Sequence, residues 1–514
     1  MDGSAFQRMA LRSALSMATG RRWLGRFAVC GILLSAGRAL CGSASAQPAQ
    51  TPAFIEAPCD LPNVPARLRP RLQCGTVNVP RDYGHPDAER FALAVAVVRS
   101  EQQPALPDPL LYVSGGPGGP LTIYAAYQGA HPFAPGRDLI LVDQRGTGRS
   151  EPHFCPDLRD DFVNALAEVA LGPEVPMRAR RRAIFTACRQ QAAAQGIDLN
   201  DFGTSVTVED FNSVRQALGV AQWNVFGVSY GTTVAMTLMA RHPETVRAAV
   251  LDSVNPPDPL LPRYSSNVAE ARRAFFSSCS RDEACAAEFP DLATTYQDAL
   301  KRLDQAPLPV LLPAELHHPG NHGPLTASSF ELVVGRLLYF PKFYPGLPRL
   351  ITAVHDGDTT LFASSLADLL AQARDPDTGS NFAANAAVDC RDRPRYREPL
   401  GEGANIFEQI SLYGMCDGWS ELGPPPVVPL DTDVPTLVLA GQFDPNATPA
   451  ASRHVTDLIG PHAQWIEFAR SGHSVRAFSP CASKIVAEFV DQPARPLDTS
   501  CAGQPAPISF LPRR

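Results

Sequence analysis

The sequence lacks the patterns that mark a metal enzyme or a nucleotide-binding protein. It contains no Cys-x-x-Cys and no His-Glu-x-x-His segment, so a metal site has no support. Its most glycine-rich loop, residues 114–120, has no lysine of the kind that a phosphate-binding loop requires. No internal repeat or low-complexity tract stands out. We therefore expect neither a metal nor another cofactor.

Positive charge is also scarce. The 514 residues contain 45 lysines and arginines against 52 acidic residues, which gives a formal charge of −7. Residues 1–46 hold six of the arginines and one acid, Asp2, so a chain that starts at Gln47 carries a charge of −12. An acidic surface repels nucleic-acid phosphates and anionic membranes, and we expect neither as a partner. The oligomeric state is left open by the sequence.

The N-terminal apolar run, residues 27–36, is too short to span a bilayer as a permanent anchor. Arg21, Arg22 and Arg26 come shortly before it, and the small residues Ala44-Ser45-Ala46 follow it directly before Gln47. This is the pattern of a secretory signal peptide. We expect residues 1–46 to be removed and the protein to be periplasmic or extracellular. The arginine pair at 21–22 leaves both the general and the twin-arginine export routes open.

The chain after the predicted leader contains an even number of cysteines. Ten of the twelve lie outside residues 1–46, and an even number in an exported chain favours disulfides over metal ligation. Spacing does not prove the connectivity. If neighbours in the sequence pair, the bonds are Cys59–Cys74, Cys155–Cys188, Cys279–Cys285, Cys390–Cys416 and Cys481–Cys501.

From residue 74 onward the hydrophobic pattern is that of an α/β protein. The first two strand-like runs predict an antiparallel hairpin, and helical stretches at 208–218 and 233–241 separate later runs. Together they predict a mostly parallel, eight-stranded sheet flanked by helices. The predicted strands are residues 75–79, 91–98, 109–113, 138–142, 223–228, 248–251, 436–440 and 465–468.

Between residues 255 and 430 the alternation of strand and helix patterns ends, and the patterns are helical. A helical insertion that leaves a sheet and rejoins it predicts a cap domain over the catalytic face. The expected organisation is a leader at 1–46, a core at 47–254, a helical cap at 255–430 and the rest of the core at 431–514. The cap helices are expected at residues 265–278, 293–303, 328–339, 360–374 and 406–414.

The segment Gly227-Val228-Ser229-Tyr230-Gly231 joins a strand-like run to a helix-like run. A serine at this junction is held in a strained turn, with its hydroxyl outside the sheet and near the positive end of the helix. The two glycines let the helix approach the strand. Because Gly-x-Ser-x-Gly also occurs by chance, a nucleophilic role for Ser229 needs an oxyanion hole, a base and an acid elsewhere in the chain.

Residues 114–120, which read Ser-Gly-Gly-Pro-Gly-Gly-Pro, follow the predicted strand 109–113. A loop of this kind turns backbone N–H groups toward an anion without interference from side chains. We predict an oxyanion hole made by the N–H groups of Gly116 and Tyr230; a plain tight turn is the alternative. The next strand ends at Asp143-Gln144-Arg145, and we interpret Asp143 and Arg145 as structural supports of this loop.

Two late segments supply the base and its acid. Asp444 directly follows the predicted strand 436–440, and His473 follows the last strand, 465–468. The order Ser229, Asp444, His473 is the serine–acid–histidine order typical of α/β-hydrolases. Asp252 also ends a strand and is an alternative acid.

These segments together resemble the proline iminopeptidase and tripeptidyl aminopeptidase family of α/β-hydrolases, over nearly the whole chain after residue 46. Cys390, Cys416-Asp417-Gly418-Trp419, Cys481 and Cys501 are similar to the secreted tripeptidyl aminopeptidase branch. The resemblance implies a serine exopeptidase that acts at free peptide N-termini. Ser114 stands where the iminopeptidases usually carry histidine, so a preference for proline does not follow. The turn from Asp444 to Pro449 is one residue longer than usual in the family.

The substrate class stays open at this point. The same three residues cleave peptides, esters and lactones, so a secreted carboxylesterase is the alternative enzyme, and a non-catalytic binding module would require a broken triad. An aminopeptidase also needs a carboxylate for the substrate ammonium group. Asp392 is our candidate, because Cys390 would fix its segment and the tripeptidyl branch tends to carry an acid there. An exposed charge between Arg391 and Arg393 is the plain alternative.

Overall fold

In the part of the chain that the structure describes, the sheet has nine strands, one more than the sequence indicates. The computed structural model describes residues 52–126, 135–161, 163–164, 177–258, 260, 263–311, 322–374, 381–399, 408, 412, 414–505 and 507–513. The strand order is β1-β2-β3-β5-β4-β6-β7-β10-β11. Its strands are β1 (Phe54–Ala57), β2 (Leu72–Pro80), β3 (Arg90–Val98), β4 (Leu110–Val113), β5 (Leu139–Val142), β6 (Trp223–Val228), β7 (Val246–Asp252), β10 (Thr436–Gly441) and β11 (Ala463–Phe468).

The strands β5, β4, β6, β7, β10 and β11 run parallel, whereas β1, β2 and β3 pair antiparallel at one edge and β3 pairs antiparallel with β5. The additional strand, β1, is short and mostly exposed, so its hydrophobic pattern is weak. It packs closely on β2: a Cβ at Gly75 would lie only 2.3 Å from the Ile55 carbonyl oxygen, so only glycine fits there. The Cys59–Cys74 disulfide fastens this edge.

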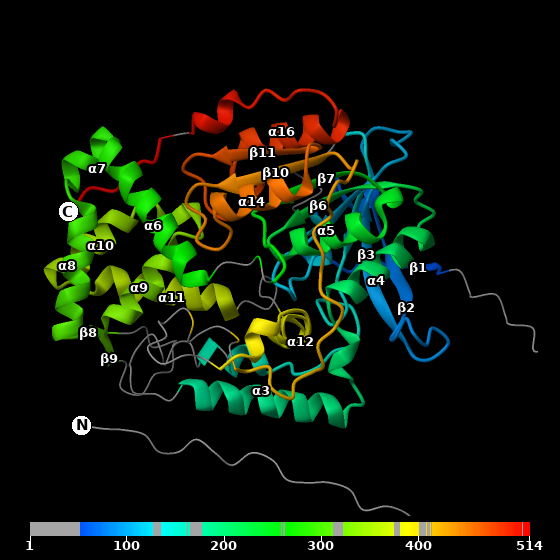
Figure 1. Cartoon of the computed structure of the whole chain (residues 1–514), viewed down its shortest axis with the longest axis horizontal. Coiled ribbons are helices and arrows are strands. Elements are labelled where there is room, and N and C mark those ends of the chain that lie inside the picture. Colours follow the sequence, from blue (N-terminus) through cyan, green and yellow to red (C-terminus); the bar gives the residue numbers. More distant parts are fainter. Residues whose placement is uncertain are drawn as a thin grey trace, which may run out of the picture. The chain divides into compact units, whose positions relative to one another are not determined.

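Helices cover both faces of the sheet, so consecutive strand residues enter different cores (Figure 1). Val225 and Leu251 pack with residues of α4 and α5 on one face, whereas Phe226 and Val250 pack with residues of α16 on the other. This two-sided burial is the physical reason for the continuous apolar runs of the parallel strands. The flanking helices are α3 (Met177–Ala194), α4 (Thr204–Ala217), α5 (Tyr230–Arg241), α14 (Pro449–Ile459), α15 (Val475–Phe478) and α16 (Pro480–Asp491).

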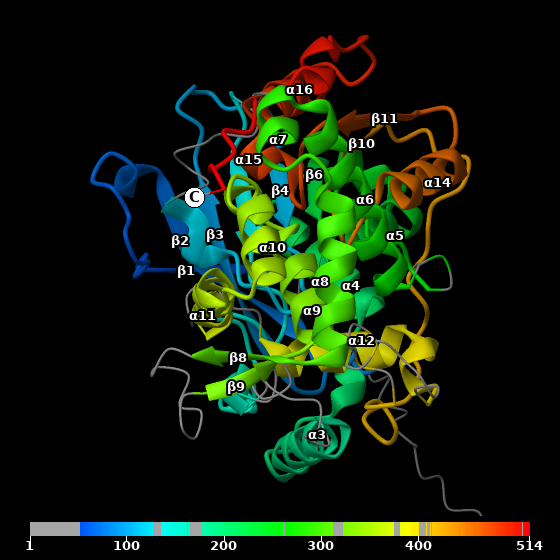
Figure 2. The same cartoon turned by 90° about the vertical axis from the view of Figure 1, so that its left-hand side faces the viewer.

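The chain between β7 and β10 is mainly helical, as the sequence indicates. Its helices α6 to α11 build a separate apolar cluster, which Phe443 joins from the loop after β10. Figures 1 and 2 show the hairpin of β8 (Leu308–Leu311) and β9 (His322–Leu325) at one end of this group, a feature that the sequence did not reveal. The helices are α6 (Tyr264–Arg281), α7 (Glu283–Glu288), α8 (Leu292–Gln305), α9 (Ala327–Leu337), α10 (Leu347–Asp356), α11 (Thr360–Arg374) and α12 (Phe382–Asp392).

The predicted helix at 406–414 lies largely outside the described residues. The same holds for the predicted leader, so its removal stays a prediction. Within the part of the chain that the structure describes, no helix is both long enough and apolar enough to cross a membrane.

All ten cysteines outside the predicted leader form disulfides, in the five pairs that neighbouring positions suggest. We expect the exported protein to begin at or near Gln47 and to show no thiol reactive toward Ellman's reagent when denatured without reductant. N-terminal sequencing and the thiol titration check this, with a reduced sample as the control. Several reactive thiols before reduction would contradict both the pairing and the oxidising destination that it implies.

Candidate active site

Ser229 stands at a sharp turn between β6 and α5. Its backbone has φ 56° and ψ −126°, a conformation that a serine adopts only under strain. The turn is tight: a Cβ at Gly227 would lie 2.4 Å from the Gly231 carbonyl oxygen, and one at Gly231 would lie 2.2 Å from that of Val113. The two glycines are therefore required by the contact between helix and strands, as the sequence indicates.

Asp444 and His473 are hydrogen-bonded to each other. The His473 Nδ1 lies 2.8 Å from one carboxylate oxygen of Asp444 and 3.0 Å from the other, and both side chains are buried. The turn after β10 fixes the carboxylate, because the N–H groups of Asn446 and Ala447 donate to Oδ1 at 2.8 and 2.9 Å. Since Asp444 accepts the proton on Nδ1, the other ring nitrogen, Nε2, carries the free lone pair.

The alternative acid, Asp252, has a different set of partners. Its carboxylate accepts hydrogen bonds from the N–H groups of Val475 and Arg476, both at 2.9 Å, and so fixes the start of α15 directly after His473. Burial raises the pKa of Asp252 to about 6. Its backbone carbonyl accepts the Ser229 N–H at 3.0 Å. Asp252 thus supports the serine and histidine segments and does not bond to the imidazole.

A residue from the helical insertion completes this arrangement. The ring of Tyr339, just after α9, stacks on the His473 ring with 4.2 Å between centroids, and its backbone carbonyl accepts the His473 N–H at 3.3 Å. Burial raises the pKa of Tyr339, and a hydrogen bond with the Ser229 side chain acts in the opposite direction. His473 Nε2 has no hydrogen-bond partner among the described residues. Tyr339 therefore links the serine and the histidine, and no sequence signal marks it.

The glycine-rich loop lies directly against Ser229. A Cβ at Gly115 would be 2.7 Å from the Ser229 Cβ, and Gly116 has φ 117°. Within the described residues, neither the Gly116 N–H nor the Tyr230 N–H donates to a protein acceptor. Both predicted donors of the oxyanion hole are therefore available to a substrate oxygen.

Two groups hold this loop from outside. Asp143 accepts the N–H groups of Leu121 and Thr122 at 2.6 and 2.9 Å, which anchors the C-terminal end of the loop as expected. The second group was not predicted: at the start of α12, the Asn381 N–H donates to the Gly118 carbonyl at 2.8 Å, and Asn385 Nδ2 donates to that of Pro117 at 3.1 Å.

Arg145 does not touch the glycine-rich loop, so its interpretation as a support of that loop is wrong. It forms a buried ion pair with Asp210 of α4 at 2.7 Å. Its guanidinium also donates to the carbonyls of Pro80, Arg81 and Asp201. Arg145 therefore ties α4 to the antiparallel edge of the sheet, because a long buried guanidinium can reach several carbonyls at once.

Asp392 is buried at the end of α12, so the interpretation as an exposed loop charge is wrong. One carboxylate oxygen accepts the Thr204 N–H at 2.8 Å and the Thr204 hydroxyl at 2.6 Å. The other, Oδ1, is buried and has no hydrogen-bond partner in the described part of the chain. The Thr204 hydroxyl also lies 2.8 Å from the Tyr230 hydroxyl. Burial raises the pKa of Asp392 to about 6. The carboxylate is covered, and it reaches Tyr230 through Thr204.

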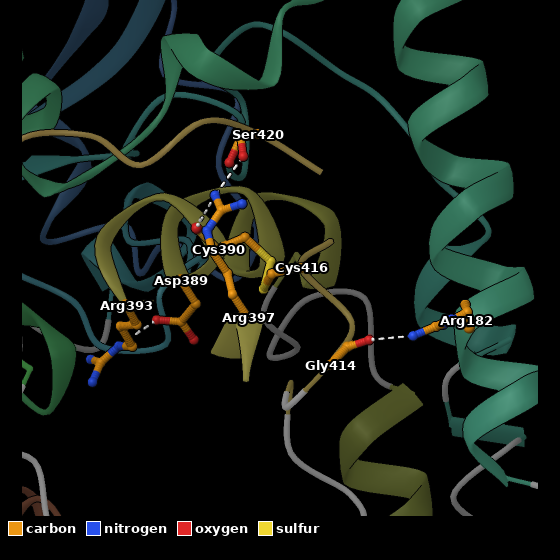
Figure 3. The surroundings of a disulfide bond; sticks show 8 residues. All are labelled: Arg182, Asp389, Cys390, Arg393, Arg397, Gly414, Cys416 and Ser420. Carbon is orange, nitrogen blue, oxygen red and sulfur yellow. Dashed lines mark hydrogen bonds and ion pairs between the residues drawn. A yellow bond between two sulfur atoms is a disulfide. The ribbon is translucent and has the colours of Figure 1, made fainter. Parts of the chain in front are cut away.

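A disulfide and several polar contacts hold the end of α12, where Asp392 lies; Figure 3 shows the surroundings of the disulfide. The Cys390–Cys416 disulfide joins α12 to the following loop, and Asp389 pairs with Arg393 at 2.8 Å. Arg397 donates to the carbonyls of Cys390 and Ser420, and Arg182 donates to that of Gly414. In the described part of the chain, no group of three His, Cys, Asp or Glu side chains could hold a metal ion.

Known proteins resemble this chain in sequence or in structure. The tripeptidyl aminopeptidase of Streptomyces coelicolor is 33% identical over 193 residues, which cover 36% of this chain and about a third (35%) of that protein. The serine protease Hip1 of Mycobacterium bovis is 26% identical over 83% of this chain and 86% of its own length. A proline iminopeptidase structure from Mycobacterium smegmatis covers 82% of this chain and 98% of its own, at 17% identity and a TM-score of 0.40.

The sequence relatives, which include a proline iminopeptidase of Neisseria gonorrhoeae that is 26% identical over 28% of this chain, support the resemblance to the proline iminopeptidase and tripeptidyl aminopeptidase family that the motifs suggest. The family described as the alpha/beta hydrolase fold matches residues 108–479, which is well over half of the chain. That stretch includes Ser229, Asp444, His473 and the whole helical insertion. The predicted fold class is confirmed, and the chain belongs to the α/β-hydrolase fold family.

Proposed function

We propose that the protein is an exported serine exopeptidase that releases residues or short peptides from free peptide N-termini. The observation that carries this proposal is the strained Ser229 with the buried Asp444–His473 pair, both of which Tyr339 contacts. Two N–H groups next to the serine have no protein acceptor among the described residues. The names of the relatives, an aminopeptidase and a serine protease, favour peptides as substrates. Five disulfides and the leader pattern favour an oxidising destination.

In this mechanism the Ser229 hydroxyl attacks the substrate carbonyl while His473 Nε2 takes its proton. Asp444 holds the Nδ1–H and stabilises the imidazolium that forms. The N–H groups of Gly116 and Tyr230 donate to the developing oxyanion, a contribution on the order of 3 kcal/mol for each donor. His473 then protonates the leaving amine, and water hydrolyses the acyl-Ser229 bond by the reverse proton path.

The exopeptidase part is tested by blocking the substrate amine. We expect a tripeptidyl anilide with a free N-terminus to be cleaved with a kcat/KM at least about 100-fold above that of its N-acetylated form, because acetylation removes the charge that an acidic partner would bind. A short-chain ester serves as the reference for an intact triad. Equal rates on the free and acetylated anilides, with fast ester cleavage, would overturn the aminopeptidase proposal in favour of an esterase.

Asp392→Asn separates two roles for the Asp392 carboxylate in the same assay. The sequence suggests that Asp392 binds the substrate ammonium, which would raise KM for the free-amine anilide alone. Because the carboxylate is covered and acts through Thr204 and Tyr230, we expect instead a fall of roughly tenfold in kcat that is equal for anilide and ester. A change confined to KM of the free-amine substrate would contradict this positioning role.

The rate should fall as the pH is lowered, because a protonated His473 cannot accept the serine proton. Asp252 and Asp392, whose pKa values burial raises to about 6, also take up protons in the acidic range. We therefore expect log kcat/KM to fall with a slope greater than one.

The folded protein should survive this loss of activity. Below about pH 6 these two carboxyls bind protons in the folded state that the unfolded chain, with its pKa near 3.8, does not yet bind, so their contribution to the unfolding free energy rises as the pH falls toward 4. Circular dichroism should show an intact fold at the pH where half the activity is gone. A rate that does not change between about pH 5 and 8 would contradict a histidine base.

A further inference from the structure

An arginine of the helical insertion lies one aromatic ring away from His473. Arg336 is in the last turn of α9, and its guanidinium carbon lies 5.2 Å from the centroid of the Tyr339 ring. The same ring stacks on the imidazole of His473 at 4.2 Å. Tyr339 thus contacts both the cation and the proposed base, which brings a fixed positive charge close to the proposed reaction centre.

Among the residues that the structure describes, the guanidinium of Arg336 has no carboxylate partner. The described residues offer it one hydrogen bond, to the Tyr264 hydroxyl at 3.4 Å, and no ion pair. Arginines on the same helical cluster are paired: Arg272 bonds Glu331 at 3.0 Å and Arg263 bonds Glu408 at 2.8 Å. Among the described residues, the cluster thus supplies counter-charges to Arg272 and Arg263 but none to Arg336, which lies one ring away from His473.

Arg336 is partly exposed, as are its neighbours Tyr264 and Tyr339. An exposed cation–π contact is weak, so it compensates little for the water that the guanidinium has lost. A planar guanidinium bonds best to a carboxylate, through two parallel N–H···O bonds. The missing counter-charge is thus of the kind that a substrate can supply.

We propose that Arg336 binds a substrate carboxylate on the leaving-group side of the scissile bond. This inference rests on the proposed function for its orientation: the donors of Gly116 and Tyr230 face the acyl oxygen, whereas His473 delivers its proton to the departing amine. A group bound beside His473, on the side of Tyr339 and Arg336, belongs to the departing portion. The carboxylate is either the C-terminus of a short peptide or an acidic side chain just after the cleaved bond.

Calorimetric binding tests this with three peptides: tetra-alanine, its C-terminal amide, and Ala-Ala-Ala-Glu amide. The protein is the full exported chain with Ser229→Ala, so that no peptide is consumed. We expect tetra-alanine to bind at least about tenfold more tightly than its amide, as a charge-assisted pair provides. The glutamyl amide distinguishes the two sources, because it regains affinity only if a side-chain carboxylate also reaches Arg336.

Arg336→Gln in the same background should abolish the difference between acid and amide, and Arg336→Lys should leave part of it. The matched control is Arg273→Gln, an exposed arginine of α6, which should keep the full difference. Thermal melting verifies that each variant is folded; if the glutamine variant is not, the lysine variant decides. The proposal would be overturned if the Ser229→Ala protein with Arg336 unchanged bound tetra-alanine and its amide equally tightly. It would also be overturned if the difference in affinity persisted in Arg336→Gln. Binding is measured without turnover, so these two outcomes are distinct from a failure of the exopeptidase proposal, which is judged by the cleavage of free and acetylated anilides.

Discussion

The close crossing of α5 over the sheet is the constraint on which the rest of the site depends. Gly231 lies so near to the Val113 carbonyl that no side chain fits, and this contact fixes the helix start directly after Ser229. The strain of the turn, about 1–3 kcal/mol for such a backbone conformation, is sustained by burial of the strand and helix around it. The same packing leaves the Tyr230 N–H unused and places the glycine-rich loop against the serine.

Several buried carboxylates hold the other parts of the site in place. Asp444 bonds the imidazole, Asp252 holds the segment after it, and Asp143 anchors the glycine-rich loop. Each is satisfied mainly by backbone N–H groups or by one side chain, which is how a protein keeps a buried charge without a full ion pair. Asp392 differs because one of its oxygens has no partner among the described residues, so it is the least well compensated of the four.

Much of this arrangement follows from the sequence because it is local. Buried strands produce continuous apolar runs, and the residue after each parallel strand must lie at one edge of the sheet, so Ser229, Asp444 and His473 can be read from their positions. Tight turns can be predicted because they require glycine at particular positions. The edge strand β1 and the hairpin β8–β9 are short and exposed, and they leave only weak patterns.

Contacts between distant segments could not be predicted. Tyr339 meets His473, and Asn381 meets the glycine-rich loop, only because the insertion folds back over the site. The role of Arg145 was misassigned for the same reason, since its partners lie on α4 and on the antiparallel edge. The burial of Asp392 likewise depends on the distant Thr204.

The proposed mechanism depends most directly on Ser229 as the nucleophile, and active-site trapping tests this role. A fluorophosphonate should add once to the exported protein, and peptide mapping should place the adduct on Ser229. Ser229→Ala should take up no reagent and should lose at least about a thousandfold in kcat, while a melting temperature near that of the parent shows that the fold is intact. Turnover that persists in Ser229→Ala, or an adduct on another residue, would contradict the account.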